Sequence, residues 1–534
     1  MSEFDEKSYI EETAVELVGK RSVNGTSGEV AEADRLVEIL RRIPYFREHE
    51  DAVWTQNLPG DPLGRKNVFA FIGKEGETKT VLYHSHFDTV GTKDFGPLEE
   101  DATNPERLRE FFANQEEDGD AARDARSGDW LFGRGALDMK SGDAVNVANM
   151  RYFAEHPDEL GGNLLFMGNC VEENDHLGVI AALDELKRLK EERGLEYTVA
   201  VNTDFISPKY PGDSRKYIYY GAAGKILTCL YVRGVETHVG NTYDGLNSTA
   251  IASRLNCLLD NNPEFTEDFP GEEILPSTCL MIRDWKDFYN VQTPKTTRMY
   301  FNTFTYSTPA CELLEKFKDR IVEECRRMTD LAKDRRAEYL RKLGFSEAED
   351  DRFIDVWTFG EYAEMMRERC DFDVECEKFV YEHTAFDKRA AGFELIDRLE
   401  ERFGDGRAKV VLFIAPPFCP HNAVDESTPA YLNLRKVFAE PGYVFRKYFP
   451  YLSDSSYIAV DETEEELERM RGDFPLMDEL YPLPYATMRS LSIPAVDTGV
   501  FGKGAHTWKE RVFKPYSYGI LPGKIREYTK LMWR

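Results

Sequence analysis

The stretch TVLYHSHFDTV, residues 80–90, joins a strand-like apolar run to a cluster of polar side chains. Thr80–Tyr83 has the apolar composition of a buried strand, and it runs directly into His84-Ser85-His86. Similar runs follow at Leu164–Asn169 and Tyr197–Val201, and helical patterns separate them. Alternating strands and helices of this kind predict an α/β fold with a mostly parallel sheet.

Each of these predicted strands ends beside side chains that can bind metals or protons. His86 follows the first strand, Glu172 and Glu173 follow the second, and Asp204 follows the third. Ligands bind outside the carboxyl ends of the strands in open α/β sheets. We therefore expect an active site at this edge of the sheet.

Composition limits the classes of protein that this chain can be. Its 68 Lys and Arg against 97 Asp and Glu give a formal charge of -29, which argues against nucleic acid and anionic membranes as partners. The nine cysteines form no CxxC pair, which favours reduced thiols. No apolar signal core and no run of ~20 apolar residues is present, so we expect a cytoplasmic location.

At 534 residues the chain is too long for one ordinary core, and its patterns predict four segments. Residues 1–215 and 406–534 are expected to form the two parts of a catalytic domain. Residues 216–345 read as a separate α+β domain, and residues 346–405 as a charged helical insertion. The acidic stretch 97–129 is expected to be a long surface insertion or loop. His383 is expected in an exposed polar stretch.

Two histidines and three carboxylates can hold two divalent ions if one carboxylate bridges them. The candidate ligands are His86, Asp138, Glu173, Asp204 and His506. Glu172 could take a proton from water and pass it to a leaving amine, and Asp88 could contact the other ring nitrogen of His86. Simpler readings stay open at this point: a glutamate pair that complements a helix dipole, an aspartate that caps a helix, and an aspartate that ends a strand.

Two longer motifs carry a resemblance to a known superfamily. VLYHSHFDTV at 81–90 and GDWLFGRGALDMK at 128–140 resemble the first and second signatures of the aminoacylase/carboxypeptidase G/succinyl-diaminopimelate desuccinylase superfamily of zinc-dependent metallopeptidases. Glu172-Glu173, Asp204 and the Gly504–Thr507 loop follow in the order of that superfamily. The resemblance therefore spans most of the chain.

The resemblance implies a role for each candidate residue. Asp138 would bridge two metal ions, His86 and Asp204 would complete one metal site, and Glu173 and His506 the other. Glu172 would be the general base and acid.

The resemblance also implies that the second domain is a lid, inserted into the catalytic domain, through which many members dimerise. His238 would stabilise the oxyanion in the site of a neighbouring subunit, and Asn290 would contact the substrate. The lid arginine that often holds a substrate carboxylate has no clear counterpart, although Arg298 lies near its place in the sequence. The run Ser453–Ser456 more loosely resembles a loop that lines the pocket, and an ordinary surface turn is an equal alternative.

The sequence thus predicts a dinuclear-metal hydrolase that cleaves an N-acyl amino acid or a short peptide. Zn²⁺ is the expected metal, and Co²⁺ or Mn²⁺ would tolerate the same ligands. The length and insertions most resemble the bacterial arginine-utilisation branch, which makes an arginine-related substrate a candidate. One alternative is an exopeptidase acting on free dipeptides. Another is an inert relative that serves as a binding or scaffold protein. The sequence argues against this alternative, because all five ligand positions and Glu172 carry side chains that are competent for catalysis.

Overall fold

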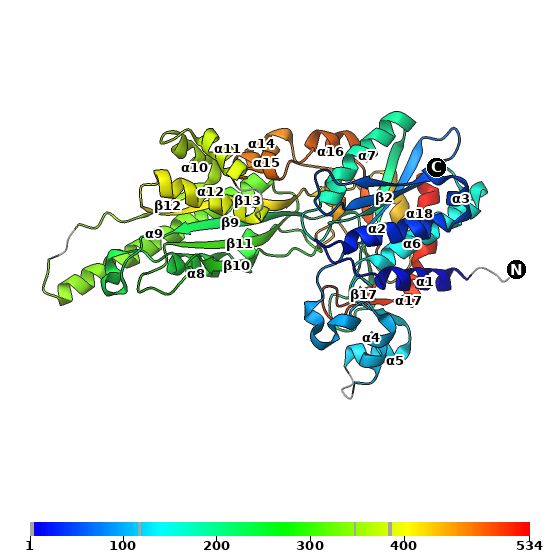
Figure 1. Ribbon diagram of the computed structural model, residues 1–534, viewed down its shortest axis with the longest axis horizontal. Helices are drawn as coiled ribbons and strands as arrows, with labels where there is room; N and C mark the ends of the chain where they lie inside the picture. The colour runs from blue at the N-terminus through cyan, green and yellow to red at the C-terminus, as the bar shows by residue number, and fades with distance from the viewer. Residues whose placement is uncertain (1–4, 116–118, 347–348, 383–386) are drawn as a thin grey trace. The chain divides into compact units, whose positions relative to one another are not determined.

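The computed structural model describes residues 5–115, 119–346, 349–382 and 387–534, and its chain contacts divide into two compact units. Unit 1 runs to Ala222 and continues through Asn422–Val460 and Pro484–Arg534. Unit 2 comprises Ala223–His421 and Asp461–Leu483. Figure 1 shows most of unit 2 in green and yellow, with helices α14 (Glu464–Gly472) and α15 (Met477–Leu480) in orange. His383 lies outside the described residues.

Unit 1 is built on an eight-stranded sheet whose four central strands are parallel. Its mixed α/β architecture confirms the predicted fold class. The apolar runs of the central strands are buried along most of their length, as expected where both faces of a sheet are covered. In sheet order the strands are β1 (Val53–Asn57), β2 (Lys66–Ile72), β5 (Asn163–Asn169), β3 (Lys79–His86), β6 (Glu196–Asn202), β16 (Ala495–Asp497), β7 (Lys216–Tyr219) and β15 (Tyr443–Arg446).

Helix α6 (Lys140–Glu155) packs on β3 and contacts α1 (Glu6–Val18) and α18 (Leu521–Met532). Its first three turns are wholly buried although they include Lys140, Ser141 and Asp143. These polar groups are paired: Lys140 Nζ donates to the carbonyls of Leu17 and Lys20, and Asp143 accepts from Ser85 at 2.6 Å. The helix that follows Asp138 is thus anchored by polar contacts that fix where it begins.

The acidic stretch 97–129 was expected to be a long surface insertion or loop, and its described residues are largely helical. It forms the single turns of η2 (Lys93–Asp101) and the helices α4 (Pro105–Ala113) and α5 (Asp120–Ser127). Asn104 caps α4, and Phe112 stacks on Phe132 of the short strand β4 (Trp130–Phe132) with ring centroids 5.0 Å apart. A few aromatic residues at helical spacing therefore outweigh the acidic composition of the stretch.

Unit 2 contains a five-stranded sheet, antiparallel except for one pair. Its strands, in sheet order, are β10 (Thr278–Asp284), β11 (Thr296–Thr305), β9 (Gly224–Arg233), β13 (Ala408–Cys419) and β12 (Ile354–Thr358). The helices that contact it include α8 (Ser248–Leu259), α9 (Ala310–Lys342), α10 (Phe359–Arg367) and α12 (Lys388–Phe403), and α11 (Phe372–Glu382) packs on α10 and α12.

The boundaries of unit 2 differ from the expected segments. Residues 346–405 were expected as a separate insertion, but their described part shares the sheet and core of unit 2. The strand expected within 406–534 is β13, and it pairs with β9 in unit 2 instead of joining the catalytic sheet. A strand that is apolar on both faces fits the interior of either sheet, so its composition does not reveal which one it joins.

The buried Lys225, at the start of β9, should destabilise the fold at neutral pH. It is 4% exposed, and its side-chain ammonium forms no hydrogen bond or ion pair within the described part of the chain. Burial lowers its pKa from 10.5 to about 8. Below pH 8 the charge is present in both the folded and unfolded states, and its burial penalises the folded state. Between pH 8 and 10.5 only the unfolded state keeps the proton, so the free energy of unfolding rises with pH.

We therefore expect Lys225→Met to raise the free energy of unfolding at pH 7 by on the order of 3 kcal/mol, and by much less at pH 10. Urea unfolding at the two pH values measures this difference. The matched control is Lys409→Met, because Lys409 is also buried but lies 2.9 Å from Glu400 and 3.0 Å from Asp405. That variant should be destabilised. Equal destabilisation of both variants would contradict the interpretation of Lys225.

Candidate metal centre

The expected metal ligands all lie in unit 1, at the carboxyl edge of the central strands. His86 is the last residue of β3, Glu172 and Glu173 follow β5, and Asp204 lies two residues beyond β6. Two more come from a small three-stranded sheet formed by β17 (Gly502–Lys503), β18 (Arg511–Phe513) and β4. Asp138 follows β4, and His506 lies in the loop between β17 and β18.

Asp138 lies between two histidines and offers one oxygen to each. Its Oδ1 is 3.2 Å from Nε2 of His86, and its Oδ2 is 3.1 Å from Nε2 of His506. The ligand atoms of His86, Asp138 and Asp204 lie within 4.8 Å of one another, and so do those of Asp138, Glu173 and His506. Asp138 thus belongs to two adjacent groups of candidate ligands, and one of its oxygens faces a histidine of each group.

The centre concentrates negative charge away from solvent. Burial raises the pKa of Glu172 and Glu173, and burial together with the charge of Asp138 raises the pKa of Asp204 to about 8. Apart from burial, the pKa values of these three groups are shifted most by one another, by other acids and by histidines, not by Lys or Arg. The two imidazoles lower the pKa of Asp138 despite its burial.

Two nitrogen and three oxygen donors with uncompensated negative charge suit divalent cations such as Zn²⁺. The side chains therefore fit a pair of metal ions. Without such cations, so many buried acids would be costly to ionise.

Asp88 connects the first histidine to the glutamate pair. His86 Nδ1 lies 3.1 Å from the carbonyl oxygen of Asp88 and 3.6 Å from its Oδ1. The carboxylate accepts the backbone N–H of Glu172 at 3.0 Å and that of Glu173 at 3.1 Å. Asn24 donates to it as well, at 2.9 Å. Asp88 therefore positions both glutamates in addition to the histidine that the sequence had suggested.

A buried ion pair holds the backbone at Asp138. Glu510 Oε1 accepts the N–H groups of Leu137 and Asp138 at 3.1 and 3.2 Å, and its Oε2 lies 2.7 Å from Nη1 of Arg134. Sequence reasoning missed Glu510, because a glutamate in a charged loop carries no pattern that separates it from a surface residue. Its place four residues after His506 is the one available signal.

A second histidine–aspartate pair lies beside Glu172. His176 Nδ1 is 2.9 Å from Oδ1 of Asp454 and 3.8 Å from Oε1 of Glu172, and all three side chains are buried. Asn169 donates to the other oxygen of Asp454 at 2.7 Å. The run Ser453–Ser456, for which the sequence left a surface turn open, is buried. Asp454 thus contributes to the surroundings of Glu172.

His238 and Asn290 both lie in unit 2, on two segments that are hydrogen-bonded to each other. Val239 N donates to the carbonyl of Val291 at 2.9 Å, and His238 is exposed. Asn290 lines a cavity of about 520 Å³ within unit 2. Arg298 is buried, pairs with Asp397 and stacks 3.5 Å from the ring centroid of Trp285. Its guanidinium is therefore already engaged.

Comparisons with known proteins identify relatives of this chain. Residues 67–248 match the model of peptidase family M28. The chain is 41% identical over 541 residues to protein RocB of Bacillus subtilis, covering 99% of this chain and 96% of the relative. It is 27% identical over 221 residues to a succinyl-diaminopimelate desuccinylase of Cereibacter sphaeroides, covering 41% of this chain and 50% of that protein. A tripeptidase from Staphylococcus aureus shares the fold, with a TM-score of 0.54, 13% identity and 99% of both chains covered.

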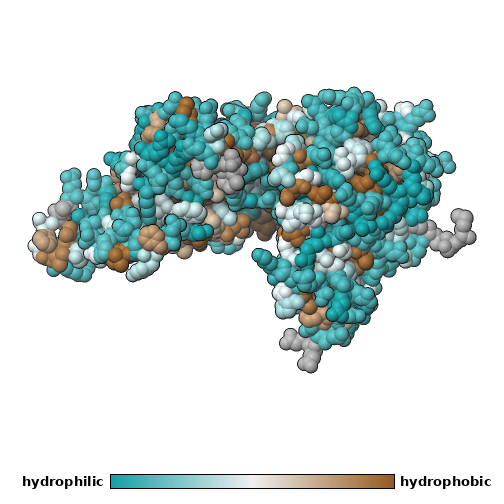
Figure 2. All heavy atoms as spheres, viewed as in Figure 1, coloured by the Kyte–Doolittle hydropathy of each residue, from teal (hydrophilic) through white to brown (hydrophobic). Residues whose placement is uncertain are grey.

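The protein is accordingly a hydrolase of peptide or amide bonds, of the metallopeptidase class that its motifs had indicated. Within the aminoacylase/carboxypeptidase G/succinyl-diaminopimelate desuccinylase superfamily, the chain belongs to the family of RocB. Among the described residues, no helix combines the length and apolar character needed to cross a membrane, and the face drawn in Figure 2 is mostly hydrophilic.

The contacts of Asp88 generate a prediction for metal affinity. In Asp88→Asn one carboxylate oxygen is replaced by an NH₂ group, which cannot accept a backbone N–H. We expect the affinity for Zn²⁺ to fall about 10- to 100-fold, as measured by competition with a chelator. Asp34→Asn is the control, because Asp34 forms an exposed pair with Lys66. Unchanged affinity in Asp88→Asn would show that Asp88 does not position the ligands.

Proposed function

We propose that this protein is a dinuclear-metal hydrolase of N-acyl amino acids or short peptides. His86 and Asp204 would hold one ion, Glu173 and His506 the other, and Asp138 both. The observation that carries the proposal is the placement of the two Asp138 oxygens against two different histidines, at 3.2 and 3.1 Å. Zn²⁺ is the metal that this ligand set favours, and Co²⁺ or Mn²⁺ accept the same donors.

Glu172 is the proposed general base and acid. It is buried, and its Oε2 lies 3.8 Å from His86 Nε2 while its Oε1 lies 3.8 Å from His176 Nδ1. Two bound divalent ions would supply polarisation of the scissile carbonyl and activation of water. Glu172 would take the proton of the attacking water and deliver it to the leaving nitrogen. Burial raises the pKa of its carboxyl group, and the imidazoles of His86 and His176 lower it.

The substrate class is proposed from two sources. The superfamily resemblance supports an acylated amino acid or a short peptide, and the resemblance to the arginine-utilisation branch supports an arginine-related one. An inert scaffold is the alternative of a different class. Against it, the five proposed ligands and Glu172 all carry side chains that are competent for the chemistry, and they lie close to one another in unit 1.

We also infer that two copies associate through unit 2. β10 is the edge strand of its sheet, and it exposes Leu280 by 58% and Ile282 by 44%. The segment that follows exposes Phe288 and Tyr289 still further. An edge strand with apolar side chains and unpaired backbone groups favours pairing with another strand. Such a homodimer would allow His238 to act in the site of the second copy.

The metal proposal predicts different losses in two variants. Elemental analysis should find about two equivalents of metal in the wild type and most of it lost in Asp138→Ala. Glu172→Gln should keep the metal and lower kcat for N-acyl amino acids by about 10²- to 10⁴-fold, because it removes only the base. If the wild type binds no metal even in excess Zn²⁺, the scaffold alternative is favoured.

The dimer proposal predicts that charge on the edge strand separates the copies. A variant carrying Leu280→Lys and Ile282→Lys should sediment as a monomer, while the wild type sediments as a dimer. His238→Ala should remain a dimer, keep its metal and lose rate, because the variant lacks only the oxyanion donor. A wild type that is monomeric and fully active would refute the role of His238 across subunits.

A further inference from the structure

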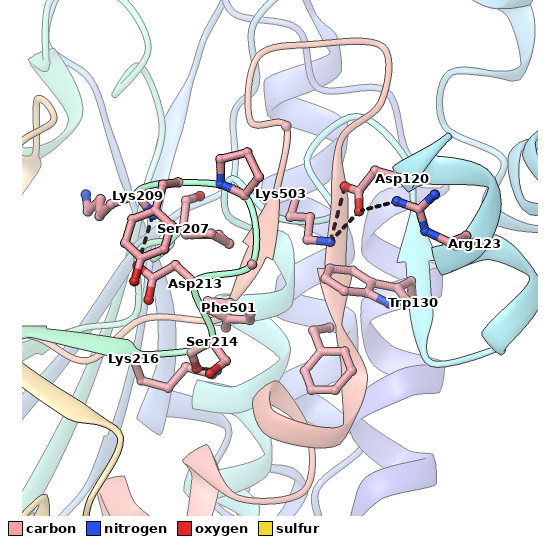
Figure 3. Close-up of a pocket in the computed structure, with 16 residues that line it drawn as sticks. Asp120, Arg123, Trp130, Ser207, Lys209, Asp213, Ser214, Lys216, Phe501 and Lys503 are labelled. Carbon is pink, nitrogen blue, oxygen red and sulfur yellow. Dashed lines mark hydrogen bonds and ion pairs between the residues drawn. The ribbon is translucent and has the colours of Figure 1, made fainter. Parts of the chain in front are cut away.

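A second feature of unit 1 is a cavity of about 840 Å³ bordered by the two loops that carry Asp204 and His506 (Figure 3). One wall is formed by residues 207–214 and Lys216, which follow Asp204, and another by Phe501, Lys503 and Gly504, which precede His506. Helix α5 and strand β4 complete it with Asp120, Arg123 and Trp130. The stretch 97–129, which was expected to be a surface insertion or loop, thus provides part of the cavity lining.

The cavity lies close to the metal centre along both of these loops. Ser207 is three residues from Asp204, and three residues of extended chain span at most about 11 Å. Gly504 is two residues from His506. The loops are hydrogen-bonded to each other, because Ile206 N donates to the carbonyl of Val500 at 2.8 Å and Gly502 N donates to that of Ile206 at 3.0 Å. This backbone pairing fixes the position of the cavity wall relative to the candidate metal ligands Asp204 and His506.

Lys216 is the cavity-lining cation that lacks a carboxylate partner among the described residues. Its Nζ donates to the carbonyl of Ser214 at 2.7 Å and lies 3.6 Å from the ring centroid of Phe501. The nearby Asp213 is already occupied by the side chains of Arg215 and Tyr217. Burial lowers the pKa of Lys216 to about 8, so its surroundings do not compensate the charge.

The other cations of the lining are engaged elsewhere. Lys503 lies 3.0 Å from Asp120 and 3.0 Å from Asp124, on the opposite wall. Arg123 also pairs with Asp120. Lys209 directs its ammonium away from the cavity in Figure 3, toward the rings of Tyr217, Tyr219 and Tyr451. The ammonium group of Lys216 is therefore the positive charge in this lining that can bind an anionic ligand.

We propose that this cavity binds a small organic carboxylate, with the anionic group at Lys216 Nζ and the hydrocarbon part against Phe501 and Trp130. One uncompensated ammonium beside aromatic walls matches a single carboxylate on an apolar body. It matches inorganic phosphate poorly, because phosphate carries more charge and has no apolar part. The carboxylate is either the distal carboxylate of a substrate, in which case this inference rests on the proposed function, or that of a free ligand.

Titration calorimetry with succinate tests the binding step without turnover. Wild type and the control Lys74→Gln, which removes an exposed lysine, should bind succinate equally. Lys216→Gln should weaken binding by at least about tenfold, because a charge-assisted hydrogen bond is lost. Lys216→Arg, which keeps the charge, should retain most of the affinity and so separates recognition of the anion from damage to the fold. Equal affinity in wild type and Lys216→Gln, or no binding to wild type, would overturn the proposal.

A pair of amides distinguishes the two sources of the carboxylate. N-succinyl-L-arginine has a distal carboxylate, and N-acetyl-L-arginine lacks it. If the substrate supplies the anion, Lys216→Gln should raise KM for the succinyl compound alone, with metal content unchanged. If a free ligand supplies it, KM for both compounds stays the same while succinate binding is lost. Failure to hydrolyse either amide would count against the proposed function only, because the calorimetric result does not depend on turnover.

Discussion

The shared carboxylate of Asp138, held between His86 and His506, is the interaction around which unit 1 is organised. Acids gathered at one buried edge repel one another, so each must be fixed by contacts that do not depend on the others. Glu510 and Arg134 hold the backbone at Asp138, and Asp88 holds that of the glutamate pair. These buried polar contacts thus hold in place a cluster of acids whose charge divalent cations would neutralise.

Much of the fold was predictable because the pattern that marks it is local. Helix α9 is an example, because the buried residues of its N-terminal half recur every three or four positions along its own sequence. The strand ends that carry His86, Glu172 and Asp204 were equally visible, because apolar runs stop where they occur. The ordered motifs then indicated the side chains that meet at Asp138.

What could not be predicted depends on partners distant in sequence. Glu510 is a supporting residue only because the chain returns to Leu137 and Asp138, and Asp454 acts beside Glu172 only because its loop is buried. The pairing of β13 with β9 reflects the same limit, since an apolar strand fits more than one sheet. Composition misled at 97–129, where a small aromatic core is diluted by acidic residues. Each of these features is a property of tertiary contact rather than of local pattern.

The sheet of unit 2 has two unlike edges. β12 packs against α9 and is half-buried, whereas most side chains of β10 at the other edge are exposed or only partly covered. A sheet with two open edges can add strands from both sides and grow into a fibre, but one open edge allows a single addition. If the β10 strands of two copies pair with each other, both open edges are occupied. No exposed strand edge of this sheet is then left for a third copy of the chain. The helices that pack around β12 would then prevent further strand addition at that edge and limit assembly to a dimer.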